Sequence, residues 1–293
     1  MLRGIPCLNG KHPFTAVDPL GNRPTSPYHD DLSTIETVMP DIQILKPDWE
    51  PRADQLRDRV ILISGAAAGI GRALATCCAA QGASVVLLDR NVRGLENAYD
   101  EIVAAGHPEP ALYPLDLKGA TPDDYHTLAD VLDKEYGRLD GLVHNAAMLG
   151  ALTPIDNYDD ALWFETLQVN LNAPYLLTKA CLGLMYRPDD ASIIFTSDST
   201  GRHGKAYWGA YGVSKAGLEG FMQLLADELE ANTRVRVNSV DPGPARTALR
   251  VVAYPAENRK RLSEPADVIR PFLYLLGPDS KGTTGQQFAL RKP

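Results

Sequence analysis

Apolar runs and helical stretches alternate along the chain from Arg59 onward. Short runs rich in valine, isoleucine and leucine predict strands at residues 59–63, 84–89, 111–116, 141–145, 192–197, 235–240 and 286–290. All but the last precede a loop and a stretch whose apolar residues recur at helical spacing. Nearly continuous apolar strands that alternate with helices are typical of a parallel sheet covered on both faces. We therefore predict an α/β fold with a single doubly wound, Rossmann-type sheet and helices on both faces.

The first 52 residues follow no such pattern and are rich in proline, aspartate and asparagine. Closely spaced prolines leave little room for a helix or a paired strand. We expect two segments: an irregular or disordered N-terminal arm at residues 1–52 and one Rossmann-type domain at residues 53–293. A second interpretation is that the protein starts at Met39 and that the 38 residues before it are a wrongly assigned or added leader.

Composition and charge narrow the range of partners. The chain has 293 residues, is 44% hydrophobic and carries a formal net charge of −8 without a run of lysine and arginine, so we expect no nucleic-acid partner. The N-terminus has no apolar stretch typical of a signal sequence or membrane anchor. The four cysteines lack the spacing of metal ligands, and Cys77 and Cys78 fall in a predicted helix. We therefore expect reduced thiols, no metal and a cytoplasmic protein.

A glycine-rich loop follows the first strand of the predicted domain. Gly65 permits a sharp turn, and Ala67 with its small neighbours lets the backbone approach a pyrophosphate. Gly69, Ile70 and Gly71 begin a helix that can pack closely against the strand. The N-terminus of this helix would face the phosphates of a dinucleotide.

The second strand ends in Asp89, at the distance from the loop where a dinucleotide-binding domain places its acidic residue. A carboxylate there accepts the ribose hydroxyls of an adenosine and repels a 2′-phosphate. Arg90 follows directly and could instead pair with that phosphate. NAD is therefore favoured over NADP, and NADP remains open.

Tyr211 and Lys215 lie four residues apart in a predicted helix and therefore share one of its faces. A lysine ammonium beside a tyrosine hydroxyl favours the phenolate and lowers the pKa of the phenol. Such a tyrosine can exchange a proton with an alcohol or a carbonyl near neutral pH. The pair predicts a catalytic acid/base.

Taken in order, these motifs resemble those of the short-chain dehydrogenase/reductase family, and the resemblance covers residues 55–293. It is greatest to bacterial members that are described only as oxidoreductases. The matching positions are the glycine loop at 65–71, Asp116, the run 144–147, Asn170, Tyr211, Lys215, the run 241–243 and Thr247. The resemblance implies that Tyr211 is the general acid/base and that Lys215 lowers its pKa and binds the nicotinamide ribose. It also implies that Asn170 holds a water molecule of a proton relay.

The resemblance further implies a set of cofactor-binding positions. Asp116 and Asn145 would lie near the adenine, and residues 240–247 near the nicotinamide. With Tyr211 and Lys215, the implied residues are Gly65, Ala67, Gly69, Ile70, Gly71, Asp89, Arg90, Asp116, Leu117, Asn145, Ala146, Pro242, Gly243 and Thr247.

Asp198 breaks the family pattern, because a serine that binds the substrate oxygen is expected thirteen positions before the tyrosine. An ionised Asp198 would disfavour a nearby phenolate and repel the oxyanion of a carbonyl substrate. Three outcomes are open. Asp198 could stay protonated and donate as the serine does, Ser197 or Ser199 could reach the site through a bulge, or the site could be catalytically impaired.

The loops that follow the strands predict an apolar substrate mouth for a small carbonyl compound or secondary alcohol. The residues expected there are Met148, Leu149, Leu152, Tyr207, Trp208, Val251, Val252 and Tyr254. Arg246 and Arg250 could engage a carboxylate or face water. Broad apolar faces on the helices around residues 161–186 and 210–232 predict a homodimer or homotetramer.

Two functions follow from these features. The first is an NAD(P)-dependent oxidoreductase that transfers hydride between nicotinamide and a carbonyl or secondary alcohol, with Tyr211 as general acid/base. The second is a nucleotide-binding sensor or scaffold protein, impaired in catalysis because Asp198 replaces the serine. A methyltransferase would leave Tyr211 and Lys215 without a role.

Overall fold

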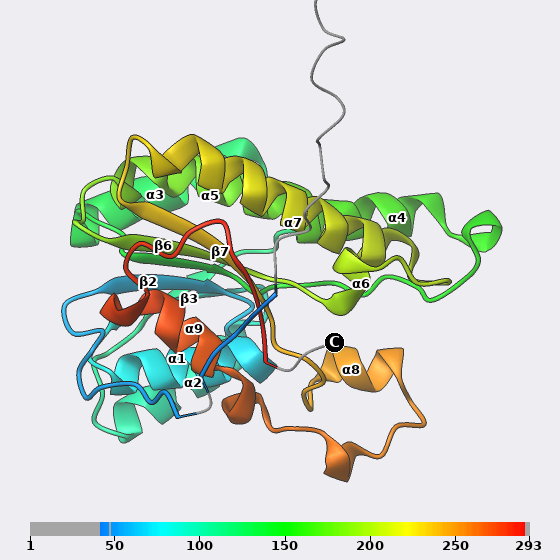
Figure 1. Ribbon diagram of the computed structural model, residues 1–293, viewed down its shortest axis with the longest axis horizontal. Helices are drawn as coiled ribbons and strands as arrows, with labels where there is room; N and C mark the ends of the chain where they lie inside the picture. The colour runs from blue at the N-terminus through cyan, green and yellow to red at the C-terminus, as the bar shows by residue number, and fades with distance from the viewer. Residues whose placement is uncertain (1–41, 47, 291–293) are drawn as a thin grey trace, which may run out of the picture. The chain divides into compact units, whose positions relative to one another are not determined.

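The computed structural model describes residues 42–46 and 48–290, which contain one sheet of eight parallel strands (Figure 1). The strand order is β1-β8-β7-β6-β5-β2-β3-β4. The strands are β1 (Gln43–Ile44), β2 (Val60–Ser64), β3 (Ser84–Asp89), β4 (Ala111–Pro114), β5 (Gly141–His144), β6 (Ala191–Thr196), β7 (Val235–Asp241) and β8 (Gln287–Ala289). The doubly wound parallel sheet is confirmed, and each predicted strand is present with its ends within two residues.

Helices cover both faces of the sheet. On one face lie α1 (Gly69–Ala80), α2 (Val92–Ala104) and α9 (Arg270–Leu276), and on the other lie α3 (Pro122–Tyr136), α5 (Ala173–Met185) and α7 (Gly209–Glu230) (Figure 1). Shorter helices are α4 (Asp160–Leu167), α6 (Ser199–Arg202) and α8 (Ala248–Ala253). The remaining turns are η2 (Ile155–Asn157), η3 (Gln168–Asn172), η4 (Arg259–Arg261), η5 (Pro265–Val268) and η6 (Pro278–Ser280).

Two apolar cores lie on the two faces of the sheet. Successive strand residues point to opposite faces, so Leu62 and Phe195 join the core under α3, α5 and α7, whereas Ile63 and Ile194 join the core under α1 and α9. Because both faces are buried, the strands are mostly apolar, with buried polar residues such as Arg236, Asn238 and Ser239 in β7. Among the described residues, no helix is both long and apolar enough to cross a membrane.

The strand order reverses at β2, whose two neighbours are β3 on one side and β5 on the other. Loops that leave β2 and β5 therefore run to opposite faces and open a crevice at the carboxyl ends of the strands, where ligands of such sheets bind. The glycine loop follows β2 at this point. The fold thus places the predicted dinucleotide site at the reversal.

The predicted arm at residues 1–52 lies mostly outside the described residues, and where the structure describes it the prediction of irregular chain is wrong for Gln43 and Ile44. These two residues form β1, which pairs in parallel with β8. An edge strand leaves backbone N–H and C=O groups unpaired, and β1 satisfies those of β8. Trp49 then packs edge-on against Tyr274, 5.4 Å between ring centroids, so Gln43, Ile44 and Trp49 belong to the folded domain.

Gly71 provides a test of the close packing of the glycine loop. A Cβ atom at Gly71 would lie 2.2 Å from the carbonyl oxygen of Gly65 and 2.6 Å from Nδ2 of Asn145. We expect Gly71→Ala to lower the free energy of unfolding by about 1–3 kcal/mol, as overpacking does, measured by urea denaturation. Gly119→Ala is the control, because a Cβ there meets nothing within 4 Å. Equal stability of the two variants would contradict the packing described here.

Candidate active site

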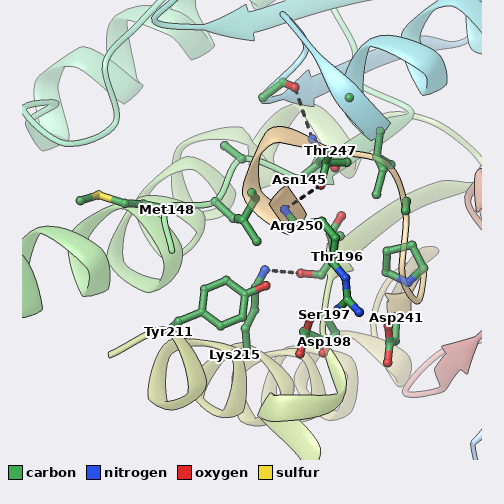
Figure 2. A pocket seen from close by; sticks show the side chains of 18 of the residues that line it. Asn145, Met148, Thr196, Ser197, Asp198, Tyr211, Lys215, Asp241, Thr247 and Arg250 are labelled. Carbon is green, nitrogen blue, oxygen red and sulfur yellow. Dashed lines mark hydrogen bonds between the residues drawn. The ribbon is translucent and has the colours of Figure 1, made fainter. Parts of the chain in front are cut away.

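A cavity of about 560 Å³ opens at the carboxyl ends of the strands and is lined by the loops after β2, β3, β5, β6 and β7 (Figure 2). Most of the predicted site residues line it: Gly65, Gly69, Ile70, Asp89, Arg90, Asp116, Leu117, Asn145, Ala146, Asp198, Tyr211, Lys215, Pro242, Gly243 and Thr247. Ala67, Gly71 and Asn170 are not part of its lining and lie buried behind it.

The glycine loop leaves the start of α1 without a side-chain cap, since the N-cap residue is Ala68. No acidic residue occupies the first turn of this 12-residue helix. Its first N–H groups therefore have no partner within the helix and are suited to bind phosphate oxygens. Gly65 and Gly69 both have positive φ angles, +71° and +57°, which other residues rarely adopt. These features fit the pyrophosphate of a dinucleotide.

Asp89 is fixed at the end of β3 by two backbone donors. Its Oδ2 accepts a hydrogen bond from the N–H of Ala67 at 3.2 Å, and its Oδ1 accepts from the N–H of Asn91 at 2.9 Å. The carboxylate is therefore tied to the glycine loop. Arg90 is exposed at the rim of the cavity.

Asn145 holds the glycine loop from the other side. Its Nδ2 donates to the carbonyl oxygens of Ser64 at 3.1 Å and Gly65 at 3.3 Å. Thr247 caps α8 by accepting a hydrogen bond from the N–H of Arg250 at 3.2 Å. Asn145 thus positions the loop with its amide, a contact that the family pattern alone did not indicate.

Tyr211 and Lys215 meet at the inner end of the cavity, on the same face of α7 (Figure 2). Both are buried, with 4% and 2% of their surface exposed. Nζ of Lys215 donates a hydrogen bond of 2.6 Å to the carbonyl oxygen of Thr196 and lies 5.6 Å from the centre of the Tyr211 ring. Burial lowers the pKa of Lys215 to about 8, although the charges of Asp198, Glu219 and Asp241 act in the opposite direction.

The pKa of Tyr211 is raised well above its ordinary value, the opposite of the direction predicted from the pair alone. Burial is the largest cause, followed by the charges of Asp198 and Asp241 and by hydrogen bonding to Asp198. Arg250 acts in the other direction. Each of the two carboxylates favours the neutral phenol, because a phenolate would add a third negative charge at this end of the cavity.

Asp198 lines the cavity beside Tyr211 and is hydrogen-bonded to it. Its Oδ1 accepts hydrogen bonds from the N–H of Thr200 at 2.8 Å and from the Thr200 hydroxyl at 2.7 Å. The side chain is thus held as a hydrogen-bond acceptor and caps α6. Of the two serines considered as replacements, Ser197 donates its hydroxyl to Glu219 and Ser199 is exposed on α6. Neither takes the place of residue 198.

Asn170 lies in a π-helical turn, η3, between α4 and α5. Its Oδ1 accepts from the N–H of Met148 at 2.7 Å, and its Nδ2 donates to the carbonyl oxygen of Met148 at 2.8 Å and to the hydroxyl of Ser214 at 3.0 Å. Both amide hydrogens are therefore used within the protein. The side chain joins the loop after β5 to α7.

A buried polar network behind Lys215 was not expected from the sequence. Glu219 accepts hydrogen bonds from the hydroxyls of Ser197 and Ser239 and forms an ion pair of 3.0 Å with Arg202. The side chains of Arg202 and Glu219 are each 6% exposed. Glu219 follows Lys215 by four residues, so its place on the same helix face was the one available signal.

The apolar mouth is smaller than predicted. Met148, Trp208 and Tyr254 line the cavity, and Leu249 and Ala253 join them. Leu152, Tyr207 and Val252 are exposed and do not line it, and Leu149 and Val251 also lie outside its lining. The two arginines engage carboxylates of the protein itself, Arg246 with Glu264 and Arg250 with Glu257.

Comparison with known proteins identifies a matching family and similar proteins. The family model described as short chain dehydrogenase matches residues 59–258. A protein of Escherichia coli named uncharacterized oxidoreductase YciK is 42% identical over 240 residues, which cover 82% of this chain and 94% of that protein. The resemblance inferred from the motifs is thereby confirmed.

Solved structures of short chain dehydrogenases are also similar to this chain. A short chain dehydrogenase from Pseudomonas syringae is 48% identical, with a TM-score of 0.83 over 85% of this chain and 100% of that one. One from Shigella flexneri, complexed with NADP, is 41% identical, with a TM-score of 0.80 over 82% of this chain and 100% of that one.

The ion pair behind Lys215 leads to a stability prediction. Glu219→Gln leaves the Arg202 guanidinium buried without an anion, and breaking such a pair costs about 3–5 kcal/mol of unfolding free energy. Urea denaturation should show this loss, whereas Glu228→Gln, an exposed change on the same helix, should stay within about 0.5 kcal/mol of the wild type. The double variant Arg202→Met with Glu219→Leu should recover part of the loss. Similar curves for Glu219→Gln and Glu228→Gln would contradict the network.

Proposed function

Because the chain belongs to the short-chain dehydrogenase/reductase family of oxidoreductases, we propose that it transfers hydride between a nicotinamide dinucleotide and a carbonyl or secondary alcohol, with Tyr211 as general acid/base. The observation that carries this proposal is the meeting of Tyr211 and Lys215 at one end of a cavity whose wall includes the glycine loop. One cavity thus joins a phosphate-binding loop to a proton donor.

The dinucleotide supplies or accepts the hydride, and the residues of the chain bind it and move the proton. The uncapped N-terminus of α1 would hold the pyrophosphate, and Asp89 the adenosine ribose. Lys215 has two ammonium hydrogens beyond the one given to Thr196, and these can reach a ribose hydroxyl or Tyr211. Asn170 and Ser214 fix α7 against the loop after β5, which keeps Tyr211 in place.

In the direction of reduction, the hydroxyl of Tyr211 gives its proton to the substrate oxygen as hydride reaches the carbon. In the direction of oxidation it takes that proton back. The raised pKa of Tyr211 keeps it protonated, which suits the donor role better than the acceptor role. Lys215, with a pKa of about 8, can return a proton to it near neutral pH.

A nucleotide-binding protein without turnover is the second candidate. It is favoured by one observation, that Asp198 stands beside Tyr211 and opposes the phenolate. The two candidates predict different results when the Tyr211 hydroxyl is removed. An enzyme would lose turnover, whereas a nucleotide-binding protein without turnover would change only in local packing.

Further features belong to the same proposal. Large apolar side chains are exposed on α4, α5 and α7, namely Phe164, Tyr175, Val213 and Leu224, and these support assembly as a homodimer or homotetramer. The free cysteines Cys77, Cys78 and Cys181 suit a reducing compartment such as the cytoplasm.

Tyr211→Phe tests the catalytic assignment. Loss of a positioned acid/base lowers kcat by about 10²- to 10⁴-fold, so reduction of a panel of ketones and aldehydes should fall by at least that lower factor. Dinucleotide binding, measured by isothermal titration, should change less than threefold, about 0.7 kcal/mol. Tyr186→Phe is the control, because Tyr186 is exposed and far from the lining of the cavity. A wild type that binds the dinucleotide but reduces no member of the panel would support the second candidate.

Cofactor choice is the second test. We propose that Asp89, held by Ala67 and Asn91, makes NAD the preferred dinucleotide, although a similar protein is solved with NADP and Arg90 stands at the rim. Asp89→Asn should shift the ratio of NAD to NADP affinity toward NADP by about 10-fold or more, as removal of one close negative charge does. Arg90→Ala should weaken NADP alone. Tighter binding of NADP than NAD by the wild type would overturn this preference.

A further inference from the structure

The carboxyl ends of β6 and β7 bring two acidic side chains to the same end of the cavity. Asp198 follows β6 and Asp241 ends β7, and these two strands are adjacent, with Thr196 paired to Val240. Both side chains line the cavity together with Tyr211 and Lys215 (Figure 2). Burial is the largest cause of the raised pKa of Asp241, and the charge of Asp198 adds to it.

Neither carboxylate takes part in an ion pair within the described part of the chain. Asp198 accepts from the N–H and the hydroxyl of Thr200 and is also hydrogen-bonded by the hydroxyl of Tyr211, and Asp241 accepts from the N–H of Gly243 at 2.8 Å. These donors are all uncharged. Each carboxylate therefore keeps lone pairs and most of its charge available to a ligand in the cavity.

The arginines that line this end of the cavity are each paired with a carboxylate of the protein. Arg202 pairs with Glu219 at 3.0 Å, and Arg250 makes two hydrogen bonds of 2.7 Å to Glu257. Lys215 is the remaining cation in the lining at this end, among the described residues, and it is committed in part to the carbonyl oxygen of Thr196. Lys205 stands just outside the lining, where its Nζ donates to the hydroxyl of Tyr254 at 3.1 Å. With both aspartates ionised and Lys215 protonated, this end of the cavity carries one excess negative charge, close to where the substrate oxygen must lie.

Such a site disfavours a neutral carbonyl substrate, because reduction places negative charge on oxygen beside two carboxylates. A positive charge on the substrate itself removes the conflict. An ammonium group on the carbon next to the reacting carbon would pair with a carboxylate and would also stabilise the developing oxyanion.

The rest of the cavity lining at this end suits an apolar group. Trp208 and Tyr254 lie 5.9 Å apart between ring centroids, and Met148 and Leu249 complete the apolar lining. A substrate with an aryl or branched alkyl group on one side of the reacting carbon and an amine on the other would match both halves.

We propose that the substrate is a 1,2-amino alcohol or the corresponding α-amino ketone, bound through its ammonium group by Asp198 with the support of Asp241. This inference rests on the proposed function of the same site. In the oxidation direction the C–H bond of the carbinol breaks, its hydride goes to the oxidised nicotinamide, and the hydroxyl proton goes to the phenolate oxygen of Tyr211, which thereby becomes the neutral phenol. The ammonium group is unchanged by the reaction.

A charge series of three alcohols of similar size tests the proposal: 2-amino-1-phenylethanol as cation, 1-phenyl-1-propanol as neutral compound and mandelate as anion. We expect kcat/KM of the wild type to fall in that order, with the cation at least about tenfold above the neutral alcohol, the size of one charge-assisted hydrogen bond. Asp198→Asn should reduce this ratio of cation to neutral alcohol by about 10- to 100-fold, and Asp241→Asn by a smaller factor. Asp130→Asn, an exposed change on α3, is the control and should leave the ratio as it is.

The outcomes separate this proposal from the one it rests on. If Asp198→Asn lowers kcat/KM of all three alcohols by the same factor, or changes only the affinity ratio of oxidised to reduced dinucleotide, then the carboxylate acts on Tyr211 or on the nicotinamide and the proposal is overturned. If no alcohol or carbonyl compound is turned over, the proposed function fails. Isothermal titration of the protein–dinucleotide complex with the cation and the neutral alcohol then decides the charge preference alone, and equal affinities would exclude it.

Discussion

The ammonium group of Lys215 is buried beneath the ends of β6 and β7, and the chemistry of the site depends on how that charge is accommodated. Burial of an ammonium group without compensation is costly, and here it lowers the pKa of Lys215 to about 8. The carbonyl oxygen of Thr196 accepts one of its hydrogens, and the charges of Asp198, Glu219 and Asp241 act against the effect of burial. These acidic residues therefore have a function before any substrate arrives, because they keep the lysine largely protonated near neutral pH.

The same carboxylates have the opposite consequence for Tyr211. A negative charge that favours the ammonium form of Lys215 disfavours the phenolate of its neighbour, so the pKa of Tyr211 is raised. A serine at position 198 would carry no charge and would leave this balance to the lysine alone. With Asp198 in its place, the site needs an additional positive charge close to Tyr211, and both a nicotinium ring and a cationic substrate would supply one.

Much of the fold was predictable, because apolar runs and helical spacing report which faces are buried. The strands from Val60 onward, the glycine loop before α1 and the helix with Tyr211 and Lys215 all follow from such local patterns. Contacts between residues that lie far apart in the sequence do not follow from local patterns. The pairing of Gln43 and Ile44 with β8 depends on an unpaired sheet edge more than two hundred residues later, and the commitment of Asn170 to Met148 depends on how two loops meet.

The same limit applies within the site. Strand alternation does not extend to the serines beside position 198, because β6 ends at Thr196, and it does not identify their partners. Only the fold shows that Glu219 on α7 accepts the hydrogen bond of the Ser197 hydroxyl and forms an ion pair with Arg202. The spacing of four residues places Glu219 on the same face of α7 as Lys215. It does not predict which side chains Glu219 contacts there.

The cost of this arrangement bears on the choice between an enzyme and a scaffold. A buried ion pair is often no more stabilising than apolar residues of the same volume, and a buried lysine with a lowered pKa is a net cost to the fold. A protein that only bound a dinucleotide through its glycine loop and Asp89 would have no need to bury Lys215, Arg202 and Glu219 around a tyrosine at the far end of the cavity. Polar groups that oppose stability are expected where chemistry requires them. The charges at the ends of β6 and β7 therefore favour the enzyme.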